Sequence, residues 1–177
     1  MSEVTIRPAR EEDLPAVGAL TFEAYLANGY LAGREDGSYA RQLSNARPRR
    51  EEAELLVAVD DTGTILGTVT IAHPGSTMRE IGHDDDLEFR MLAVSPAARG
   101  RGVGEALTRR VMDEAARLGF TAVVLSSSEQ MHAAHRLYER LGFRRTPALD
   151  WNPEPDVGLI TYRLELKNKG WLQSDTS

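Results

Sequence analysis

The sequence predicts a mixed α/β fold, with helices and strands arranged around one sheet. Two kinds of pattern favour this class: short runs that are apolar or alternate in polarity, as in strands, and longer segments with apolar residues at helical spacing. The 177 residues suit one compact domain, and no internal repeat, low-complexity stretch or linker divides them. We therefore expect a single domain over residues 1–166 and a polar tail over residues 167–177.

The first half of the chain predicts a strand, two helices and a hairpin. A short strand is expected at residues 4–7, and apolar residues at helical spacing predict a helix over residues 11–27. Three glycines then interrupt the pattern before a second helix near residues 39–46. Residues 55–59 and 65–71 are apolar runs joined by an Asp-Asp-Thr-Gly turn cluster, which predicts a hairpin.

In the second half, strands and helices alternate after a polar loop at residues 73–86. The strand at residues 87–94 first alternates in polarity and then becomes apolar throughout, which indicates a β-bulge or entry into a buried sheet centre. Two amphipathic helices, each closed by a glycine, are expected at residues 103–118 and 131–141. Strands at residues 121–125, 143–146 and 160–166 bring the expected total to seven strands and four helices.

Composition excludes several classes of function. The net charge of −6 argues against nucleic acid or an anionic membrane as partner. With no cysteine, the chain has no disulfide, no thiolate metal site and no cysteine nucleophile. Residues 84–86 are three aspartates, which we interpret as part of a solvated loop, so no metal is expected. The absence of a signal-like or membrane-spanning run favours a cytoplasmic protein.

A glycine-rich turn between a strand and a helix is the most informative feature of the chain. Glycines leave backbone N–H groups uncovered, and the helix that follows directs its positive end toward them. Such a turn predicts a pocket for a phosphate or pyrophosphate. The residues of the turn are Arg99, Gly100, Arg101, Gly102, Val103 and Gly104. Arg99 and Arg101 are placed to meet phosphate, whereas Arg109 and Arg110 are interpreted as solvated helix charges.

The spacing of this turn excludes two common nucleotide motifs. Counting from Gly100, a dinucleotide-binding fingerprint needs a glycine where Glu105 stands, and no Lys-Ser or Lys-Thr pair completes a P-loop. What remains is Arg-x-x-Gly-x-Gly, which resembles the pyrophosphate-binding signature of the GNAT superfamily of N-acetyltransferases. The resemblance runs from residue 4 to about residue 166, with the specific motifs within residues 87–143. It implies a mostly antiparallel sheet and acetyl-CoA as co-substrate.

The resemblance also implies how the pantetheine arm of acetyl-CoA is held. In the family the fourth and fifth strands splay apart, and the arm lies in the opening against the backbone of the fourth strand, here Leu92, Ala93 and Val94. A backbone amide there polarises the thioester carbonyl. The side chains of these three residues remain available for core packing. Met131 stands where the family often has an asparagine, so we expect it to pack against the cofactor. The polar contact then falls to one of three candidates, Ser126, Ser127 or Ser128.

Acetyl transfer to an amine needs a neutral amine, a stabilised oxyanion and a proton for the departing thiolate. Residues 134–143 resemble the family segment Ala-x-x-Leu-Tyr-x-x-x-Gly-Phe, which implies that Tyr138 is the acid. A phenol, with a pKa of about 10, suits a thiolate whose thiol has a pKa of about 8.5; the alternative for Tyr138 is core packing. Glu88, six residues before Val94, is at the offset at which some branches of the family carry a carboxylate base. The alternatives are that Glu88 is a strand carboxylate paired with Arg90, or that a water relay acts as base.

The sequence thus predicts an N-acetyltransferase that moves acetyl from acetyl-CoA directly to a primary amine. A non-catalytic CoA-binding sensor and an acyltransferase for longer acyl-CoA remain open, as do small molecules, peptide termini and lysine side chains as acceptors. Many members of the family are dimers, which leaves a homodimer open. His132 and His135 are alternative bases. Fold analogy suggests an acceptor pocket near Tyr25, Tyr30, Glu35, Trp151 and the loop at residues 73–86, whose acidic residues would suit a cationic amine.

Overall fold

The computed structural model describes residues 3–29, 31 and 33–166, and all its strands belong to one sheet. The sheet has 8 strands in the order β1-β2-β3-β4-β5-β8-β6, and β7 pairs with β8 off this path. Every pairing is antiparallel except that of β4 with β5. The strands are β1 (Thr5–Pro8), β2 (Glu54–Val59), β3 (Ile65–Ala72), β4 (Asp86–Val94), β5 (Ala122–Ser128), β6 (Arg144–Arg145), β7 (Trp151–Glu154) and β8 (Val157–Glu165).

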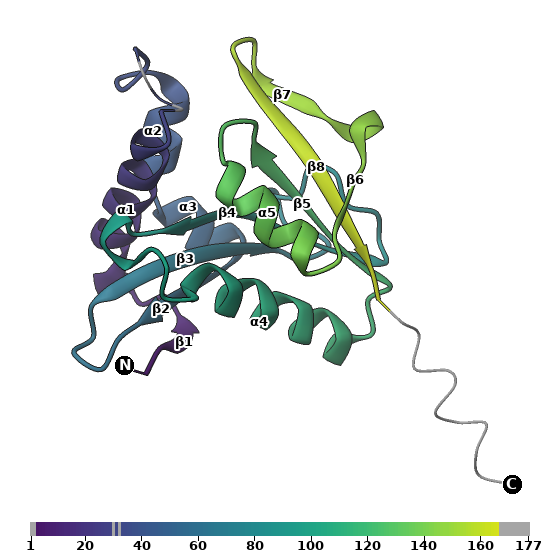
Figure 1. Cartoon of the computed structure of the whole chain (residues 1–177), viewed down its shortest axis with the longest axis horizontal. Coiled ribbons are helices and arrows are strands. Elements are labelled where there is room, and N and C mark those ends of the chain that lie inside the picture. Colours follow the sequence, from purple (N-terminus) through teal and green to yellow (C-terminus); the bar gives the residue numbers. More distant parts are fainter. Residues whose placement is uncertain (1–2, 30, 32, 167–177) are drawn as a thin grey trace, which may run out of the picture.

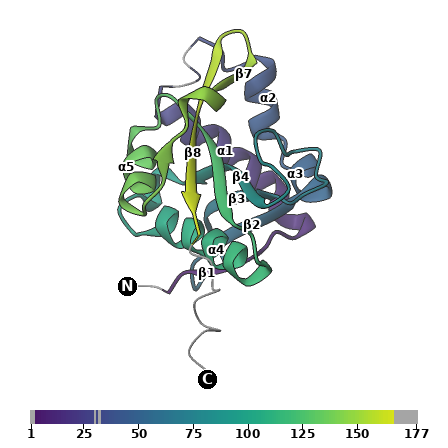
Figure 2. The ribbon, with the colours of Figure 1, turned by 90° about the vertical axis from the view of Figure 1, so that its right-hand side faces the viewer.

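The helices cover both faces of the sheet. The α-helices are α1 (Leu14–Ala27), α2 (Ser38–Ser44), α3 (Arg47–Glu52), α4 (Val103–Leu118) and α5 (His132–Arg140). Figure 2 shows α2 and α3 on one side of the strands and α5 on the other. Three 3₁₀ turns complete the described elements: Glu11–Asp13, Pro96–Ala98 and Pro147–Leu149. The layout is a three-layer α/β sandwich, as the mixed pattern of the sequence predicts.

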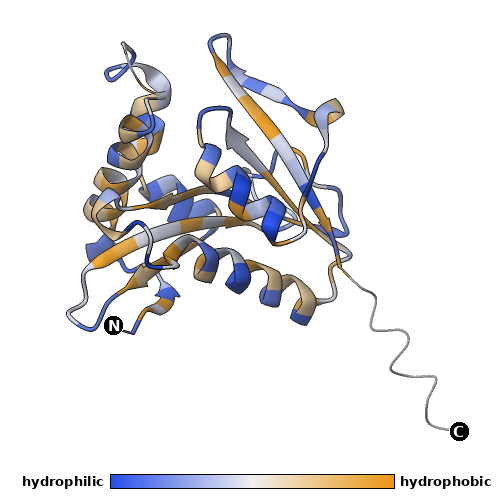
Figure 3. Ribbon diagram, in the orientation of Figure 1, coloured by the Kyte–Doolittle hydropathy of each residue, from blue (hydrophilic) through white to orange (hydrophobic). Residues whose placement is uncertain are grey.

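The core lies on both faces of the central strands. One apolar stripe of α4, made by Val103, Leu107, Val111 and Ala115, packs on β3, β4 and β5. On the opposite face, the apolar residues of α1 and α2 pack on the end of β4. Figure 3 shows the polar residues of α4 and α5 on their outer surfaces. Because both faces of the central strands are covered, their sequences are nearly continuously apolar rather than alternating.

Most predicted elements are confirmed within one or two residues, and two elements were missed. Helix α3 has the sequence Arg-Pro-Arg-Arg-Glu-Glu, which is too short and too polar to show an apolar period. Strand β7 contains Pro153 and lies in a segment that the turn residues around it marked as a loop. Its strand structure comes from pairing with β8, as in Trp151–Leu159. The sequence of β7 itself contains no signal of this pairing. The tail predicted at residues 167–177 lies outside the described residues, so the domain division stays a prediction.

Strand β4 contains the predicted irregularity, and it opens the sheet. The register with β3 passes from Thr70–Arg90 to Thr68–Ala93, so β4 carries one extra residue in between. Within this bulge Met91 has φ 54°, a left-handed value that is rare for a side chain of its size. Pairing of β4 with β5 ends at Phe89–Leu125, whereas β5 continues to pair with β8 up to Ser128. The two strands therefore diverge, and Figure 1 shows the molecule dividing into two arms above β3 and α4.

The helices α1 and α2 approach each other so closely that only glycine fits between them. A Cβ added at Gly18 of α1 would lie 1.9 Å from the backbone oxygen of Ser44, at the end of α2. This backbone atom cannot turn away as a flexible side chain could. The packing of α1 on α2 is part of the apolar cluster that also contains Met91 and Ala93 of β4. Gly18 therefore supports the arm of the molecule that faces the opening in the sheet.

We predict that Gly18→Ala destabilises the protein by about 2 kcal/mol or more, because overpacking against backbone forces the two helices apart. In a protein of this size the melting temperature should fall by about 4 °C or more. Gly104→Ala is the matched control: its added Cβ would meet its nearest neighbours at an ordinary 3.5 Å. Differential scanning calorimetry of both variants checks the prediction, and equal melting temperatures would contradict it.

Candidate functional site

A groove of about 280 Å³ lies where the end of β4, the turn before α4 and helix α5 meet. Ala24 of α1 and Asn28, which follows the end of that helix, also line it. Most residues predicted to bind the cofactor line this groove: Leu92, Val94, Arg99, Gly100, Gly102, Val103, Gly104 and Met131. Two predicted residues are not among the lining residues. Ala93 is buried in the core under α1 and α2, and Arg101 is exposed.

The glycine turn leaves the N-terminus of α4 uncovered. Gly100 and Gly102 have φ 78° and 75°, a conformation that residues with a side chain rarely adopt. Gly102 is the N-cap of α4, and having no side chain it makes no capping hydrogen bond to the amides of the first turn. These N–H groups and the positive end of the helix dipole favour an anion. The turn thus has the polarity and the open backbone that a phosphate group requires.

Charged residues outside the glycine-rich motif also lie around the turn. Glu105, in the first turn of α4, lies 3.4 Å from Arg140 of α5 and 3.9 Å from Arg109, so its charge is offset by two cations. Arg140 lines the groove but was missed in the sequence. No motif marks Arg140, because it reaches the groove only when α5 packs beside α4. Arg99 is exposed at the groove and adds a further positive charge.

The open edge of β4 lies next to this turn. After Phe89 the strand has β3 on one side and, among the described strands, no partner on the other. Residues 90–94 therefore present backbone N–H and C=O groups along one edge of the opening. Leu92 and Val94 line the groove at the point where this edge approaches the glycine turn. The arrangement offers an extended ligand arm a strand-like edge that ends at an anion-binding turn.

Tyr138 lies beside the groove rather than in its lining. It is 3% exposed, and its ring packs against Phe89, Phe143 and Tyr162 at centroid distances of 5.7 to 6.0 Å. Burial raises the pKa of its phenol, and the nearby hydroxyls of Tyr25 and Tyr162 add to the shift. Tyr25 belongs to α1, on the other face of the sheet. Because the pKa of Tyr138 is raised, its hydroxyl is protonated at neutral pH, and among the described residues it has no hydrogen-bond partner, so it is available as a donor.

Met131 is the N-cap residue of α5 and lines the groove while packing on the apolar cluster under α1. The three serines considered as polar substitutes do not line the groove. Ser126 accepts a hydrogen bond from Trp151 Nε1 at 2.9 Å, and Ser128 contacts the side chain of Gln130 at 3.2 Å. At this corner the groove is therefore apolar.

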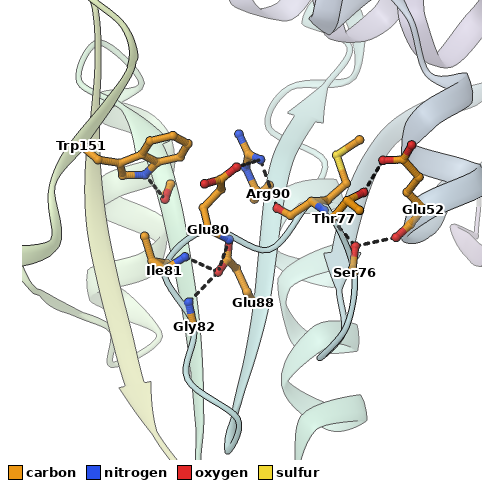
Figure 4. Close-up of polar contacts among 11 residues, drawn as sticks. Glu52, Ser76, Thr77, Glu80, Ile81, Gly82, Glu88, Arg90 and Trp151 are labelled. Atoms are coloured by element: carbon orange, nitrogen blue, oxygen red, sulfur yellow. Dashed lines mark hydrogen bonds and ion pairs between the residues drawn. The ribbon is translucent and has the colours of Figure 1, made fainter.

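Glu88 holds the loop that precedes β4. Its side chain is fully buried, and its carboxylate accepts the backbone N–H groups of Glu80, Ile81 and Gly82 at 2.8 to 3.2 Å (Figure 4). It is not paired with Arg90: among the described residues the carboxylate nearest to that guanidinium is Glu80, at 3.9 Å. Sequence reasoning missed this loop-anchoring role, because the three donors are backbone groups and carry no residue signature. The role of Glu88 as a base stays a prediction.

The residues suggested for an acceptor pocket are only partly brought together. Trp151, at the start of β7, faces the guanidinium of Arg90 at 5.4 Å from the ring centroid. Tyr25 is buried close to the same guanidinium, as the effect of Arg90 on its pKa indicates: burial raises that pKa and Arg90 opposes the rise. Glu35 is exposed in the turn before α2. Tyr30 lies outside the described residues.

One alternative base and one aspartate of the loop are buried. His135 Nε2 lies 2.9 Å from the Ser128 carbonyl, and burial lowers the pKa of His135. Asp86 is also buried rather than solvated, and pairs with Arg163 at 3.0 Å. Within the described ranges no three His, Asp or Glu side chains gather as a metal-binding group, and no helix there is long and apolar enough to cross a bilayer.

Comparisons with known proteins bear on this geometry. Residues 19–143 match the family model described as the acetyltransferase (GNAT) family. The chain is 34% identical over 112 residues to an uncharacterised N-acetyltransferase of Schizosaccharomyces pombe, an alignment that covers 63% of each protein. It is 38% identical over 103 residues to N-acetylaspartate synthetase of Rattus norvegicus, covering 58% of this chain and 32% of that one. The chain thus spans less than two thirds of either relative.

A solved structure shares the whole arrangement. It is a protein from Salmonella typhimurium, solved with its cofactor acetyl-CoA, that is 25% identical to this chain with a TM-score of 0.65. The superposition covers 94% of this chain and 96% of that chain. The similarity therefore extends from the first strand to the last and is not confined to the glycine turn.

We predict that Gly104→Val weakens CoA binding by about tenfold or more. The first added carbon would lie 3.5 Å from Val94 and Leu137, so the two methyl groups beyond it must enter the groove or displace its walls. Gly104→Ala stops at the first carbon and should bind nearly as well as the original protein. Isothermal titration calorimetry with CoA compares the variants, and unchanged affinity in Gly104→Val would remove this turn from the binding site.

Proposed function

The chain belongs to the acetyltransferase (GNAT) family, and from this we propose that it is an N-acetyltransferase that moves acetyl from acetyl-CoA directly to a primary amine while both are bound. One observation carries the proposal: the open edge of β4 leads straight to the uncovered N-terminus of α4. A strand-like edge suits an extended amide-containing arm, and a helix N-terminus suits a diphosphate. Membership of an acetyltransferase family favours acetyl transfer over mere CoA binding.

The residues present fit acetyl-CoA. The amides at residues 100–104 would hold its diphosphate, and the backbone of Leu92 and Val94 would hold its pantetheine arm. Met131 would add an apolar contact at the groove wall. Acetyl-CoA supplies an acetyl group that is already activated as a thioester. The chain contributes an ordered, partly buried environment in which an amide of β4 can polarise a carbonyl.

Tyr138 is our candidate for the acid that delivers a proton to the sulfur. Burial raises its pKa, so the phenol is protonated at neutral pH. Its hydroxyl has no partner among the described residues and lies within electrostatic reach of Tyr25 across the sheet. The alternative, that Tyr138 only fills the core beside Phe89, predicts that its hydroxyl is dispensable.

Glu88 is our candidate for the base that takes the proton of the amine, acting through water. Direct contact with an amine is disfavoured, because the carboxylate is buried and already accepts three backbone N–H groups. A carboxylate in such a site can still orient a water molecule. The loop that it holds, residues 80–82, would then order one wall of the acceptor site.

The names of relatives support a small-molecule acceptor: one relative is an N-acetylaspartate synthetase. The direct test is an assay of free-thiol release from acetyl-CoA with a panel of small amines and amino acids. Release that depends on an amine, with formation of the acetylated amine by mass spectrometry, supports the proposal. Binding of CoA without release for any amine would instead favour a CoA-binding sensor.

Tyr138→Phe should lower kcat by at least about tenfold and leave the affinity for acetyl-CoA nearly unchanged, because it removes a proton donor without changing the shape of the ring. Tyr162→Phe is the matched control, since that ring packs on Tyr138 and its hydroxyl contacts Glu139 instead. Steady-state kinetics and calorimetry check both variants. A kcat equal to that of the original protein would exclude Tyr138 from the chemistry.

Glu88→Gln should flatten the acidic limb of the pH–rate profile, where a carboxylate base loses activity by taking up a proton. The variant should also melt at a lower temperature, because an amide nitrogen would face backbone N–H groups. Glu52→Gln is the control: Glu52 holds the same loop through Thr77 (Figure 4) but is exposed and far along the loop from Glu88. If both variants keep the acidic limb, Glu88 anchors the loop and does not act as base.

A further inference from the structure

The face of the sheet that looks toward α1 and α2 carries buried polar side chains next to the groove. Thr70 of β3 pairs with Arg90 of β4, so their side chains project from the same face. Glu88 follows on the same face of β4, two residues away. A sheet face that packs on helices is normally apolar. Buried polar side chains need hydrogen-bond or ion-pair partners. Among these residues, the charge of Arg90 is the least compensated.

Arg90 is 9% exposed and lacks a close carboxylate among the described residues. Its NH1 donates to the Met78 carbonyl at 3.1 Å, and its ring contact is Trp151. The nearest carboxylate oxygen, on Glu80, is 3.9 Å away, which is beyond hydrogen-bond distance. The other acid on this face, Glu88, accepts the backbone N–H groups of residues 80–82 rather than the guanidinium of Arg90.

Arg145 is an arginine of the same protein whose guanidinium does have a carboxylate partner. It too lies over an aromatic ring, that of Tyr162 at 5.6 Å. Unlike Arg90, it makes two parallel hydrogen bonds to Asp150, at 2.8 and 2.9 Å. A guanidinium presents a planar fork that fits a carboxylate in this two-point manner. Arg90 is held in place by Met78 and Trp151, yet among the described residues the fork has no such two-point partner.

A second cation makes this region still more favourable for an anion. Arg49 is 1% exposed and donates to the carbonyls at the end of α2, not to a carboxylate. Burial, with a contribution from Arg90, lowers its pKa to about 10, so it remains charged at neutral pH. The hydroxyl of Thr70, opposite Arg90, is buried and has no hydrogen-bond partner among the described residues. A bound anion would reduce the repulsion between the two buried cations, Arg49 and Arg90, and could accept a hydrogen bond from Thr70.

The position of Arg90 relative to the groove defines the size of the ligand. Arg90 is two residues before Leu92, which lines the groove, and Tyr25 adjoins Ala24, which also lines it. Residues two apart along a chain have Cα atoms at most about 7 Å from each other, and a bulge between them shortens this distance. An anion at Arg90 would therefore sit within reach of an amine placed at the acetyl end of the groove. An amino acid carries an amine and a carboxylate at such a short separation.

We propose that Arg90 binds a carboxylate of the acceptor, so that the substrate is a carboxylate-bearing amine such as an amino acid. This inference rests on the proposed function. Trp151 fixes the plane of the guanidinium. The carboxylate of the substrate replaces the long contact that Arg90 makes with the exposed Glu80. Within the acidic loop at residues 73–86, Asp86 is already paired with Arg163 and is therefore not open to a cationic amine.

The test compares kcat/KM for amino acids with that for their α-amides, and for aspartate and glutamate with asparagine and glutamine. At least one acid should exceed its neutral partner by about tenfold or more. Arg90→Gln should lower kcat/KM for that acid by about 10- to 100-fold, mainly through KM, and leave the amide nearly unchanged. Arg90→Lys, which keeps the charge without the fork, should be intermediate. Arg145→Gln is the control and should keep the preference.

The outcomes separate this inference from the function on which it rests. Equal kcat/KM for acids and amides, or a preference that survives in Arg90→Gln and Arg90→Lys, would overturn the role of Arg90 while acetyl transfer stands. Binding of acetyl-CoA without thiol release from any amine would overturn both. Melting temperatures of the variants show whether each is folded, and the acid-to-amide ratio of the original protein needs no variant at all.

Discussion

The divergence of β4 from β5 is the constraint on which the rest of this structure depends. The two strands are parallel, so the chain must cross over between them, and the crossover contains α4. That connection brings the N-terminus of α4 to the end of β4, where the bulge at Met91 has turned the strand away from its neighbour. One topological requirement thus places an open strand edge and an uncovered helix N-terminus side by side. Neither feature alone would hold a ligand as long as CoA.

The two faces of the sheet present different groups at this opening. On the side of α4 and α5, the groove offers backbone amides, small side chains and balanced surface charges. On the side of α1 and α2, Arg90, Glu88 and Thr70 are buried where a purely structural sheet would have apolar residues. Buried polar groups in place of an apolar sheet face are typical of functional sites. Tyr138 and Tyr25 come from opposite sides of the sheet, and their hydroxyls are close enough to interact electrostatically.

Much of this could be predicted from the sequence, because the signals are local. Helix α4 has a continuous apolar stripe and a closing glycine, and the change of pattern within residues 87–94 indicated the bulge. The missing parts depend on tertiary contacts. Arg140 reaches the groove only through helix packing, β7 exists through its pairing with β8, and Glu88 is occupied by backbone donors from a loop. That Arg90 has only the long contact to Glu80 among the described carboxylates likewise becomes evident only when Glu80, Glu88 and Asp86 have been placed in space.

A crystal structure of the protein with CoA tests the central claim most directly. The account predicts the diphosphate at the amides of residues 100–104 and the pantetheine arm along the edge of β4 that faces β5. The sulfur should then lie beside the hydroxyl of Tyr138. Density for the nucleotide elsewhere on the protein, or an arm that does not enter between β4 and β5, would contradict it.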